Sequence, residues 1–211
     1  MNRGQFITVE GIEGVGKTTA MDFLHNQLLQ YGVNLAVTRE PGGTEIAEKI
    51  RKLLLAHHDE IMARDAELLL MFAARAQHIA NLIEPNLSQG HWVLCDRFTD
   101  ASYAYQGGGR GIAVDRIESL AKWTQGDLTP DYVFLLDAPV DIALTRANGR
   151  SKPDRIESEQ AAFFEKVRNS YLERANRDPK RYHIIDASLS IEKVESQLKT
   201  GLRKIIEEHN D

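Results

Sequence analysis

The amino-acid sequence predicts an α/β fold in which a five-stranded parallel sheet is flanked by helices on both faces. Two observations lead to this prediction: short apolar runs recur along the 211-residue chain, and segments with helical periodicity separate them. Strands and helices that alternate in this way build a parallel sheet through right-handed crossovers. The chain length suits one domain, so we expect a single unit over residues 1–211.

The strands are predicted from runs of apolar and β-branched residues without alternation, which is typical of strands buried on both faces. They are FITVE (6–10), LAVTR (35–39), WVLCD (92–96), YVFLLD (132–137) and YHIID (182–186).

The helices are predicted from apolar residues at helical spacing. They lie around 23–28 with a stop at Gly32, around 46–54, at about 65–84 with an end near Pro85, near 113–124, around 163–172 with an end before Asp178, and at the C-terminus. The third is apolar on almost all sides, so we expect it to be buried on several of them.

Charged residues end the predicted strands, among them Glu10, Arg39 with Glu40, Asp96 with Arg97, and Asp137. In open α/β sheets, ligands bind beyond the carboxyl ends of the strands. The sequence therefore predicts a binding site at this edge of the sheet.

The segment GIEGVGKTT follows the first strand directly and has the spacing G-x-x-x-x-G-K-T. Such a loop directs backbone N–H groups and a helix N-terminus toward phosphate, its lysine reaches the β- and γ-phosphates, and its threonine hydroxyl binds Mg²⁺. Its strand before and helix after favour this reading over a chance match. We expect ATP to contact Gly11, Ile12, Glu13, Gly14, Val15, Gly16, Lys17, Thr18 and Thr19. An acid among phosphates needs a nearby cation, so Glu13 requires a basic partner.

Several residues outside this loop have two readings. Asp96 ends a strand where P-loop enzymes place a Mg²⁺-associated acid, and it also suits a helix cap. Arg75, on the apolar third helix, needs either a carboxylate partner or an anionic ligand. Arg51 suits a solvated helix face or an anion site. The segment YAYQGGGRG (103–111) reads as a flexible loop that either lies on the surface or reads a base edge, and the basic stretch 146–155 is either a solvated charge run or a mobile lid.

Composition excludes several classes. The net charge of −5 argues against binding a nucleic-acid polymer, which needs an excess of basic residues on one face. One cysteine, Cys95, excludes an internal disulfide and suits the cytoplasm. The chain has no run of 18 apolar residues, so we expect no membrane span.

Taken together, the motifs resemble the thymidylate kinase family. The matching segments are VEGIEGVGKTT, TREPGGT, LMFAARAQH, DRFTDASYAYQGGGRG and RANGRSKPDRIE, which follow the family's order and span nearly the whole chain. The resemblance implies a P-loop nucleoside monophosphate kinase domain with a mobile lid at about residues 146–156. It also implies a homodimer; the apolar third helix suits either a dimer face or the core of a monomer.

The resemblance implies roles for individual residues. In the matching subclass the phosphate loop carries an acid, here Glu13, and the lid supplies the catalytic arginine. That arginine would be Arg150, the partner of Glu13, with Arg146 nearer the adenine or in support.

On the acceptor side, the resemblance implies that Arg75 and Arg97 clamp the dTMP phosphate with Arg51 alongside. The thymine edge would be read by Ser102 and Gln106, while Tyr105 would lie beneath the sugar. The acids Glu10 and Glu40 would lie near the acceptor phosphate and sugar. Phe72 would stack on the base, although Met71 occupies the position four residues before Arg75 where many relatives have the stacking phenylalanine.

The implied reaction is the transfer of the γ-phosphoryl group of ATP to dTMP, which gives dTDP and ADP. The acceptor phosphate has a second pKa of about 6 and needs no general base at neutral pH. Positive charge from Mg²⁺, Lys17, Arg97 and Arg150 would offset the repulsion between the two anions. The alternatives are another nucleotide or nucleoside kinase, a P-loop switch, which the lack of an N-K-x-D segment disfavours, and an ATP-dependent nucleic-acid motor.

Overall fold

The computed structural model describes residues 3–147 and 153–210. Its five strands are β1 (Phe6–Glu10), β2 (Leu35–Arg39), β3 (Trp92–Asp96), β4 (Tyr132–Asp137) and β5 (Tyr182–Asp186), with the bounds that the sequence predicts. They form one parallel sheet in the order β2-β3-β1-β4-β5. The predicted fold class is therefore confirmed.

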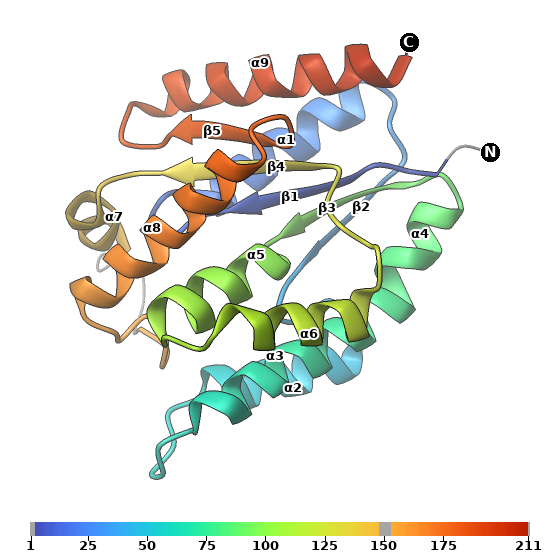
Figure 1. The fold of residues 1–211 in the computed structure, drawn as a ribbon. Helices are drawn as coiled ribbons and strands as arrows, with labels where there is room; N and C mark the ends of the chain where they lie inside the picture. The colour runs from blue at the N-terminus through green and yellow to red at the C-terminus, as the bar shows by residue number, and fades with distance from the viewer. Residues whose placement is uncertain (1–2, 148–152, 211) are drawn as a thin grey trace.

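The helical segments of the described chain are α1 (Lys17–Gln30), α2 (Glu45–Leu55), α3 (Arg64–His78), the π-helical η1 (Ile79–Ile83), α4 (Glu84–Ser88), α5 (Thr99–Ser102), the π-helical η2 (Tyr103–Gly109), α6 (Val114–Gln125), α7 (Val140–Ala147), α8 (Ala161–Arg177) and α9 (Ile191–Asn210). Helices α1 and α9 pack together on one face of the sheet, while α4 and α8 cover the other (Figure 1). Helices α2, α3 and α6 form a further layer beside the second face (Figure 1).

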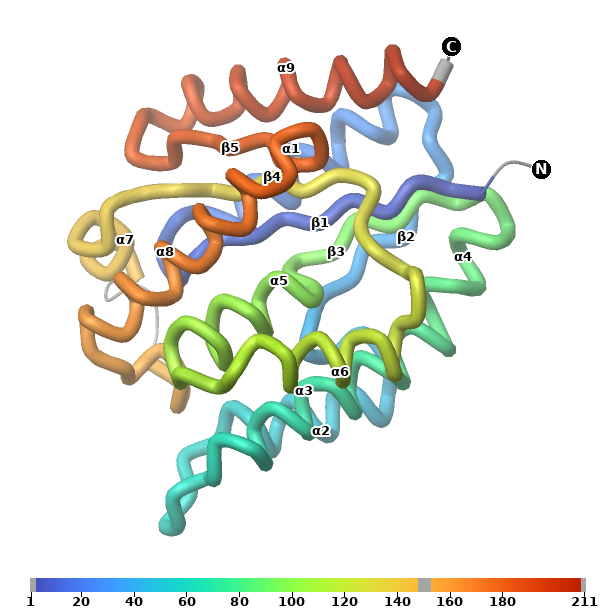
Figure 2. Tube along the Cα trace, viewed as in Figure 1, coloured from blue at the N-terminus to red at the C-terminus, as the bar shows by residue number. Residues whose placement is uncertain are grey.

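The register of the sheet brings the charged strand ends to one edge. Asp96 of β3 lies level with Val9 of β1 on one side and with Arg39 of β2 on the other. Figure 2 shows that β1 begins, and α9 ends, at the opposite side of the molecule. Every residue of the central strand β1 is buried, so the edge that carries Glu10 is held by a rigid core.

Two helix predictions are corrected. The third predicted helix does not end near Pro85: π-helical turns over Ile79–Ile83 lead directly into α4, and Pro85 lies in the first turn of α4. Helix α3 is also less buried than the sequence predicts, since Leu69 on this helix is 55% exposed.

The segment 103–111 is not a flexible loop either, because residues 103–109 continue α5 as π-helical turns. Its glycines serve close packing: a Cβ on Gly108 would lie 2.8 Å from the Cβ of Ser170 on α8, and a Cβ on Gly109 would overlap the Phe163 ring. Among the described residues, no helix combines the length and apolar character that a membrane crossing needs.

Candidate active site

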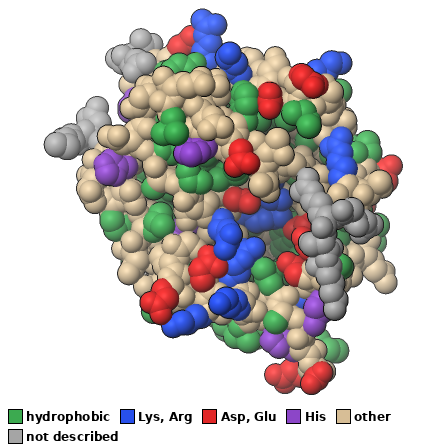
Figure 3. All heavy atoms as spheres, turned by 180° about the vertical axis from the view of Figure 1, so that it is seen from behind, with side chains coloured by type: hydrophobic (Ala, Val, Ile, Leu, Met, Phe, Trp, Pro, Cys, Tyr) green, Lys and Arg blue, Asp and Glu red, His purple; other side chains and the backbone are tan. Residues whose placement is uncertain are grey.

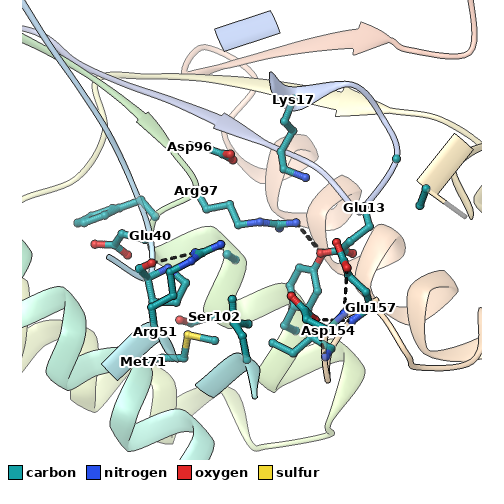
Figure 4. Close-up of a pocket in the computed structure, with 18 of the residues that line it drawn as sticks. Glu13, Lys17, Glu40, Arg51, Met71, Asp96, Arg97, Ser102, Asp154 and Glu157 are labelled. Atoms are coloured by element: carbon teal, nitrogen blue, oxygen red, sulfur yellow. Dashed lines mark hydrogen bonds and ion pairs between the residues drawn. The ribbon is translucent and has the colours of Figure 1, made fainter. Parts of the chain in front are cut away.

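A cavity of about 360 Å³ opens at the carboxyl ends of the strands. Figure 3 shows, from behind, a hollow around which basic and acidic side chains gather. Figure 4 shows Lys17 and Asp96 at one end, Met71 and Ser102 at the other, and Arg97 between them. The cavity brings together most of the predicted site residues: Glu13, Gly14, Gly16, Lys17, Thr18, Glu40, Arg51, Arg75, Asp96, Arg97, Ser102, Tyr105 and Gln106.

The loop between β1 and α1 has the backbone that a phosphate cradle needs. Gly11, Gly14 and Gly16 have φ values of 138°, 76° and 94°, which L side chains rarely adopt. The Lys17 ammonium donates to the carbonyl oxygens of Gly11 at 3.0 Å and Ile12 at 2.9 Å. Burial, with repulsion from Arg97, lowers the pKa of Lys17 to about 8. A bound polyphosphate would restore its full charge.

Thr18 and Asp96 offer oxygen ligands for a magnesium ion. Both line the cavity, and Asp96 Oδ1 is a buried oxygen with no hydrogen-bond partner among the described residues. The described chain contains no cluster of three or more His, Cys, Asp or Glu that could hold a metal by itself. One hydroxyl and one carboxylate still fit Mg²⁺, which usually takes one or two protein ligands and completes its shell with phosphate oxygens and water.

Arg97 is the cation beside Glu13, a pairing that the sequence did not predict. Arg97 Nη2 donates to Glu13 Oε1 at 2.8 Å, and the Tyr105 hydroxyl donates to Glu13 Oε2 at 2.6 Å. Arg97 has a φ of 71°, unusual for a residue with a side chain. Its Nη1 also donates to the Tyr171 hydroxyl at 3.0 Å. Glu13 therefore joins the phosphate loop to the segment after β3. The expected partner Arg150 lies outside the described residues.

Arg75 has a carboxylate partner and also lines the cavity, where it can meet an anionic ligand; the sequence left both possibilities open. Its Nε donates to Glu40 Oε2 at 2.7 Å in a pair whose side chains are 3% and 4% exposed. Its Nη2 donates to the Phe98 carbonyl and to the Ser102 hydroxyl, each at 3.1 Å. Its Nη1 is buried without a partner among the described residues, although Arg75 lines the cavity. Arg75 thus has one guanidinium nitrogen without a partner among the described residues, and it directly contacts a predicted base-reading side chain.

The Glu40 carboxylate has a second buried partner. His78, fully buried on α3, approaches Glu40 Oε1 through Nδ1 at 3.1 Å and Thr38 Oγ1 through Nε2 at 2.7 Å.

Arg51 is not on a solvated helix face: it lines the cavity and donates to the Pro41 carbonyl at 2.9 Å. This hydrogen bond ties α2 to the Pro-Gly-Gly turn.

The far end of the cavity has a partly apolar wall. Met71 lines it together with Ser102, Tyr105 and Gln106. The expected place of Phe72 is corrected: it is 2% exposed, does not line the cavity, and packs under the Arg75 guanidinium, whose carbon lies 4.6 Å from the ring centroid. Residues 71 and 72 lie on different sides of α3, so only one can face the cavity.

Six other expected residues do not line the cavity. Glu10 is fully buried, and its carboxylate accepts from the Phe98 N–H at 2.7 Å and the Tyr171 hydroxyl at 2.8 Å. Burial raises the pKa of Glu10 to about 8. Arg146 donates to the carbonyls of Ala187 at 2.6 Å and Ser188 at 3.3 Å, and Thr19 is exposed on α1. The backbone of Gly11, Ile12 and Val15 shapes the loop without lining the cavity.

Two acids at the end of the lid segment were not predicted from the sequence. Asp154 and Glu157 line the cavity, and Asp154 Oδ1 accepts from the N–H groups of Ile156 at 2.8 Å and Glu157 at 2.9 Å. Their signal was the segment PDRIE, where an Asp three residues before a Glu is typical of a turn or helix start. The place of Met71 in the cavity could also have been predicted, since Met71 holds the position at which many relatives have the stacking phenylalanine.

Comparison with known proteins identifies the family. The sequence model of the family described as Thymidylate kinase matches residues 9–198. The chain belongs to the thymidylate kinase family. It is similar to the thymidylate kinase of Pseudomonas putida (strain W619), with 54% identity over 202 residues, 96% of this chain and 98% of the relative.

Two further relatives support the same family. The thymidylate kinase of Ruthia magnifica subsp. Calyptogena magnifica is 52% identical over 203 residues, 96% of this chain and 99% of the relative. The crystal structure of thymidylate kinase from Ehrlichia chaffeensis matches with a TM-score of 0.76 and 33% identity, covering 95% of this chain and 99% of that one. Membership of the thymidylate kinase family confirms the resemblance and the expected enzyme class, and decides against a switch protein or a nucleic-acid motor.

Proposed function

We propose that this chain transfers the γ-phosphoryl group of ATP to the phosphate of dTMP, which gives dTDP and ADP. One observation carries the proposal: a glycine-rich phosphate loop and three arginines, Arg51, Arg75 and Arg97, line the same cavity. A site that only hydrolysed ATP would need one set of phosphate ligands, whereas transfer between two phosphates needs two.

The donor side would hold ATP through the loop N–H groups and Lys17. Thr18 and Asp96 would hold Mg²⁺, which when bound adds positive charge beside the β- and γ-phosphates and helps to orient them. Lys17 would exchange its two carbonyl contacts for phosphate oxygens. Arg146, bound to the chain after β5, would support the adenine end.

On the acceptor side, Arg97 and Arg51 would bind the dTMP phosphate, and Arg75, which also lines the cavity, would contact the same nucleotide. Because this phosphate is mostly a dianion at neutral pH, it attacks without a general base. The task of the protein is alignment and charge compensation. Arg97 contacts Glu13 of the donor loop, so both sides are held in one network. Arg150 of the lid would add charge to the group in transfer.

Met71, Ser102 and Gln106 would enclose the thymine, and Tyr105 would lie beneath the deoxyribose. The Tyr105 hydroxyl is fixed by Glu13 at 2.6 Å, and its ring lies 4.8 Å from the Arg97 guanidinium carbon. A ring fixed by these two contacts would crowd a 2′-hydroxyl group on the sugar. The site would therefore prefer a deoxyribonucleotide.

The test is ADP formation in a coupled assay with dTMP, dUMP, dCMP, dGMP, dAMP and the ribonucleotide UMP as acceptors. The proposal predicts the highest kcat/KM with dTMP and dependence on Mg²⁺. Slow ATP hydrolysis that is indifferent to every monophosphate would contradict it.

The remaining parts of the proposal concern organisation. The chain would act as one domain with a lid at about residues 146–156, as a homodimer, in the cytoplasm. Exposed apolar side chains on neighbouring helices support the dimer: Leu53 on α2, Leu69 on α3 and Trp123 on α6, with Trp123 83% exposed. Sedimentation equilibrium with the wild-type chain and a Trp123→Glu variant tests this, since a charge at the interface should favour the monomer.

A further inference from the structure

A buried carboxylate lies behind the base-reading end of the cavity and has no part in the reaction. Glu67 on α3 is 2% exposed. Two guanidinium groups hold it: Arg155 Nη1 lies 2.7 Å from Oε2, while Arg110 approaches Oε1 through Nε at 3.3 Å and Oε2 through Nη2 at 3.2 Å. Burial alone would raise the pKa of Glu67, but hydrogen bonds from Gln106 and charge from Arg110 outweigh it and lower that pKa. The carboxylate is therefore ionised.

An ionised carboxylate only accepts hydrogen bonds, and this fixes the orientation of the amide beside it. Glu67 Oε1 receives its contact from Gln106 at 2.8 Å. The Gln106 group that faces Glu67 must be the NH₂, because the amide oxygen would meet a negative charge. The charge of Glu67 therefore fixes the orientation of the Gln106 amide.

The opposite end of the same amide is then an acceptor open to the cavity. Gln106 lines the cavity, and within the described chain no donor reaches its Oε1. That oxygen is also not among the buried atoms without partners, so a ligand can contact it. Pyrimidines differ in what they present to such an acceptor: the imide of thymine or uracil offers a ring N–H at N3, whereas neutral cytosine has a lone pair at N3.

We propose that Glu67 is a positioning residue for base selection. By holding the NH₂ of Gln106, it keeps an acceptor toward the base, so that a pyrimidine with an N3–H is accepted and one with an N3 lone pair is refused. The inference rests on the proposed function, because it deepens the role of Gln106 in that site. A purely structural role for Glu67, as the anion between two arginines, would change stability but not base preference.

The test is the variant Glu67→Gln, with dTMP, dUMP and dCMP as acceptors at saturating ATP. The new side chain has one oxygen for two guanidinium groups, so its NH₂ turns toward Gln106, whose amide must then reverse and show NH₂ to the base. The ratio of kcat/KM for dTMP over dCMP should fall by ~10-fold or more, the effect of one lost and one gained hydrogen bond. The ratio for dTMP over dUMP should not change, because both bases carry the same imide.

The matched control is Glu159→Gln, which removes the other carboxylate partner of Arg110 and does not touch Gln106. It should leave both ratios at their wild-type values. Unchanged ratios in a folded Glu67→Gln variant would overturn the inference, as would an equal fall in the Glu159→Gln control.

If Glu67→Gln does not fold, Glu67→Asp replaces it, since it keeps the charge and withdraws the carboxylate from Gln106. The same fall in the dTMP over dCMP ratio is expected there, and an unchanged ratio would overturn the inference. Failure of the proposed function would be distinguishable from failure of this inference, because the wild-type enzyme itself would then show no preference for dTMP over the other monophosphates.

Discussion

Replacing Glu40 by glutamine tests the buried network that holds the acceptor arginine. Glu40 accepts from Arg75 Nε at 2.7 Å, and both side chains are 3–4% exposed. The substitution leaves the Arg75 guanidinium in the interior without its counter-charge. Breaking a buried ion pair from one side typically destabilises by about 3–5 kcal/mol.

The expected change in melting temperature follows from chain length. Unfolding entropies near 2.1 cal/mol/K per residue give about 0.44 kcal/mol/K for 211 residues. A loss of about 3–5 kcal/mol then lowers Tm by about 7–11 °C. Differential scanning calorimetry measures this shift, and steady-state kinetics should show a raised KM for dTMP, because Arg75 loses the contact that orients it.

The control is Glu207→Gln, which removes the partner of Arg203 in a pair whose side chains are 60% and 74% exposed. Exposed pairs contribute little, so Tm should change by no more than about 1 °C. A Glu40→Gln variant that melts within about 2 °C of wild type would show that Arg75 does not depend on Glu40.

Three further predictions address other parts of the site. Arg150→Ala should lower kcat by ~10³-fold or more while the dissociation constant for dTMP, measured by calorimetry, stays near wild type; normal turnover would remove the lid arginine from the mechanism. Met71→Ala should raise KM for dTMP with little change in Tm, whereas Phe72→Ala should destabilise by about 3–5 kcal/mol in urea unfolding, and the reverse pattern would contradict the placement of the two side chains. Glu10 has a pKa raised to about 8 in the folded chain, so its contribution to stability is complete below about pH 4.5 and is lost as pH rises through 8. Urea unfolding at several pH values should show wild-type stability falling, relative to Glu10→Gln, between those limits; parallel curves would show that Glu10 has no raised pKa.

The fold could be predicted because its signals are local. The central strands β1, β3 and β4 are buried on both faces, so each appears as an apolar run whose ends can be recognised in the sequence, while the edge strands β2 and β5 are more exposed than the sequence predicts. The π-helical turns could not be predicted from the sequence, since they depend on how α3 and α5 pack on their neighbours. The three glycines at 107–109 suggested flexibility because the sequence does not show that α8 lies against them.

The candidate site also has a part that local sequence signals predict and a part that depends on contacts between distant segments. The phosphate loop is a contiguous motif with its own backbone chemistry, and its residues could be named in advance. The pairings Glu13–Arg97 and Glu67–Gln106 join residues 84 and 39 positions apart, and no local pattern specifies them. Glu10 shows the limit of reasoning from strand ends: it lies at the right edge of the sheet, yet its carboxylate turns into the core.

The central claim is that two phosphate-bearing ligands meet in one cavity, one held by main-chain N–H groups and the other by guanidinium groups. A crystal structure of the chain with dTMP, Mg²⁺ and a non-hydrolysable ATP analogue tests it most directly. The account predicts the triphosphate in the loop at Lys17 and the dTMP phosphate within hydrogen-bonding distance of Arg97, with Arg75 in contact with the same nucleotide. A dTMP molecule bound away from both arginines would contradict the account.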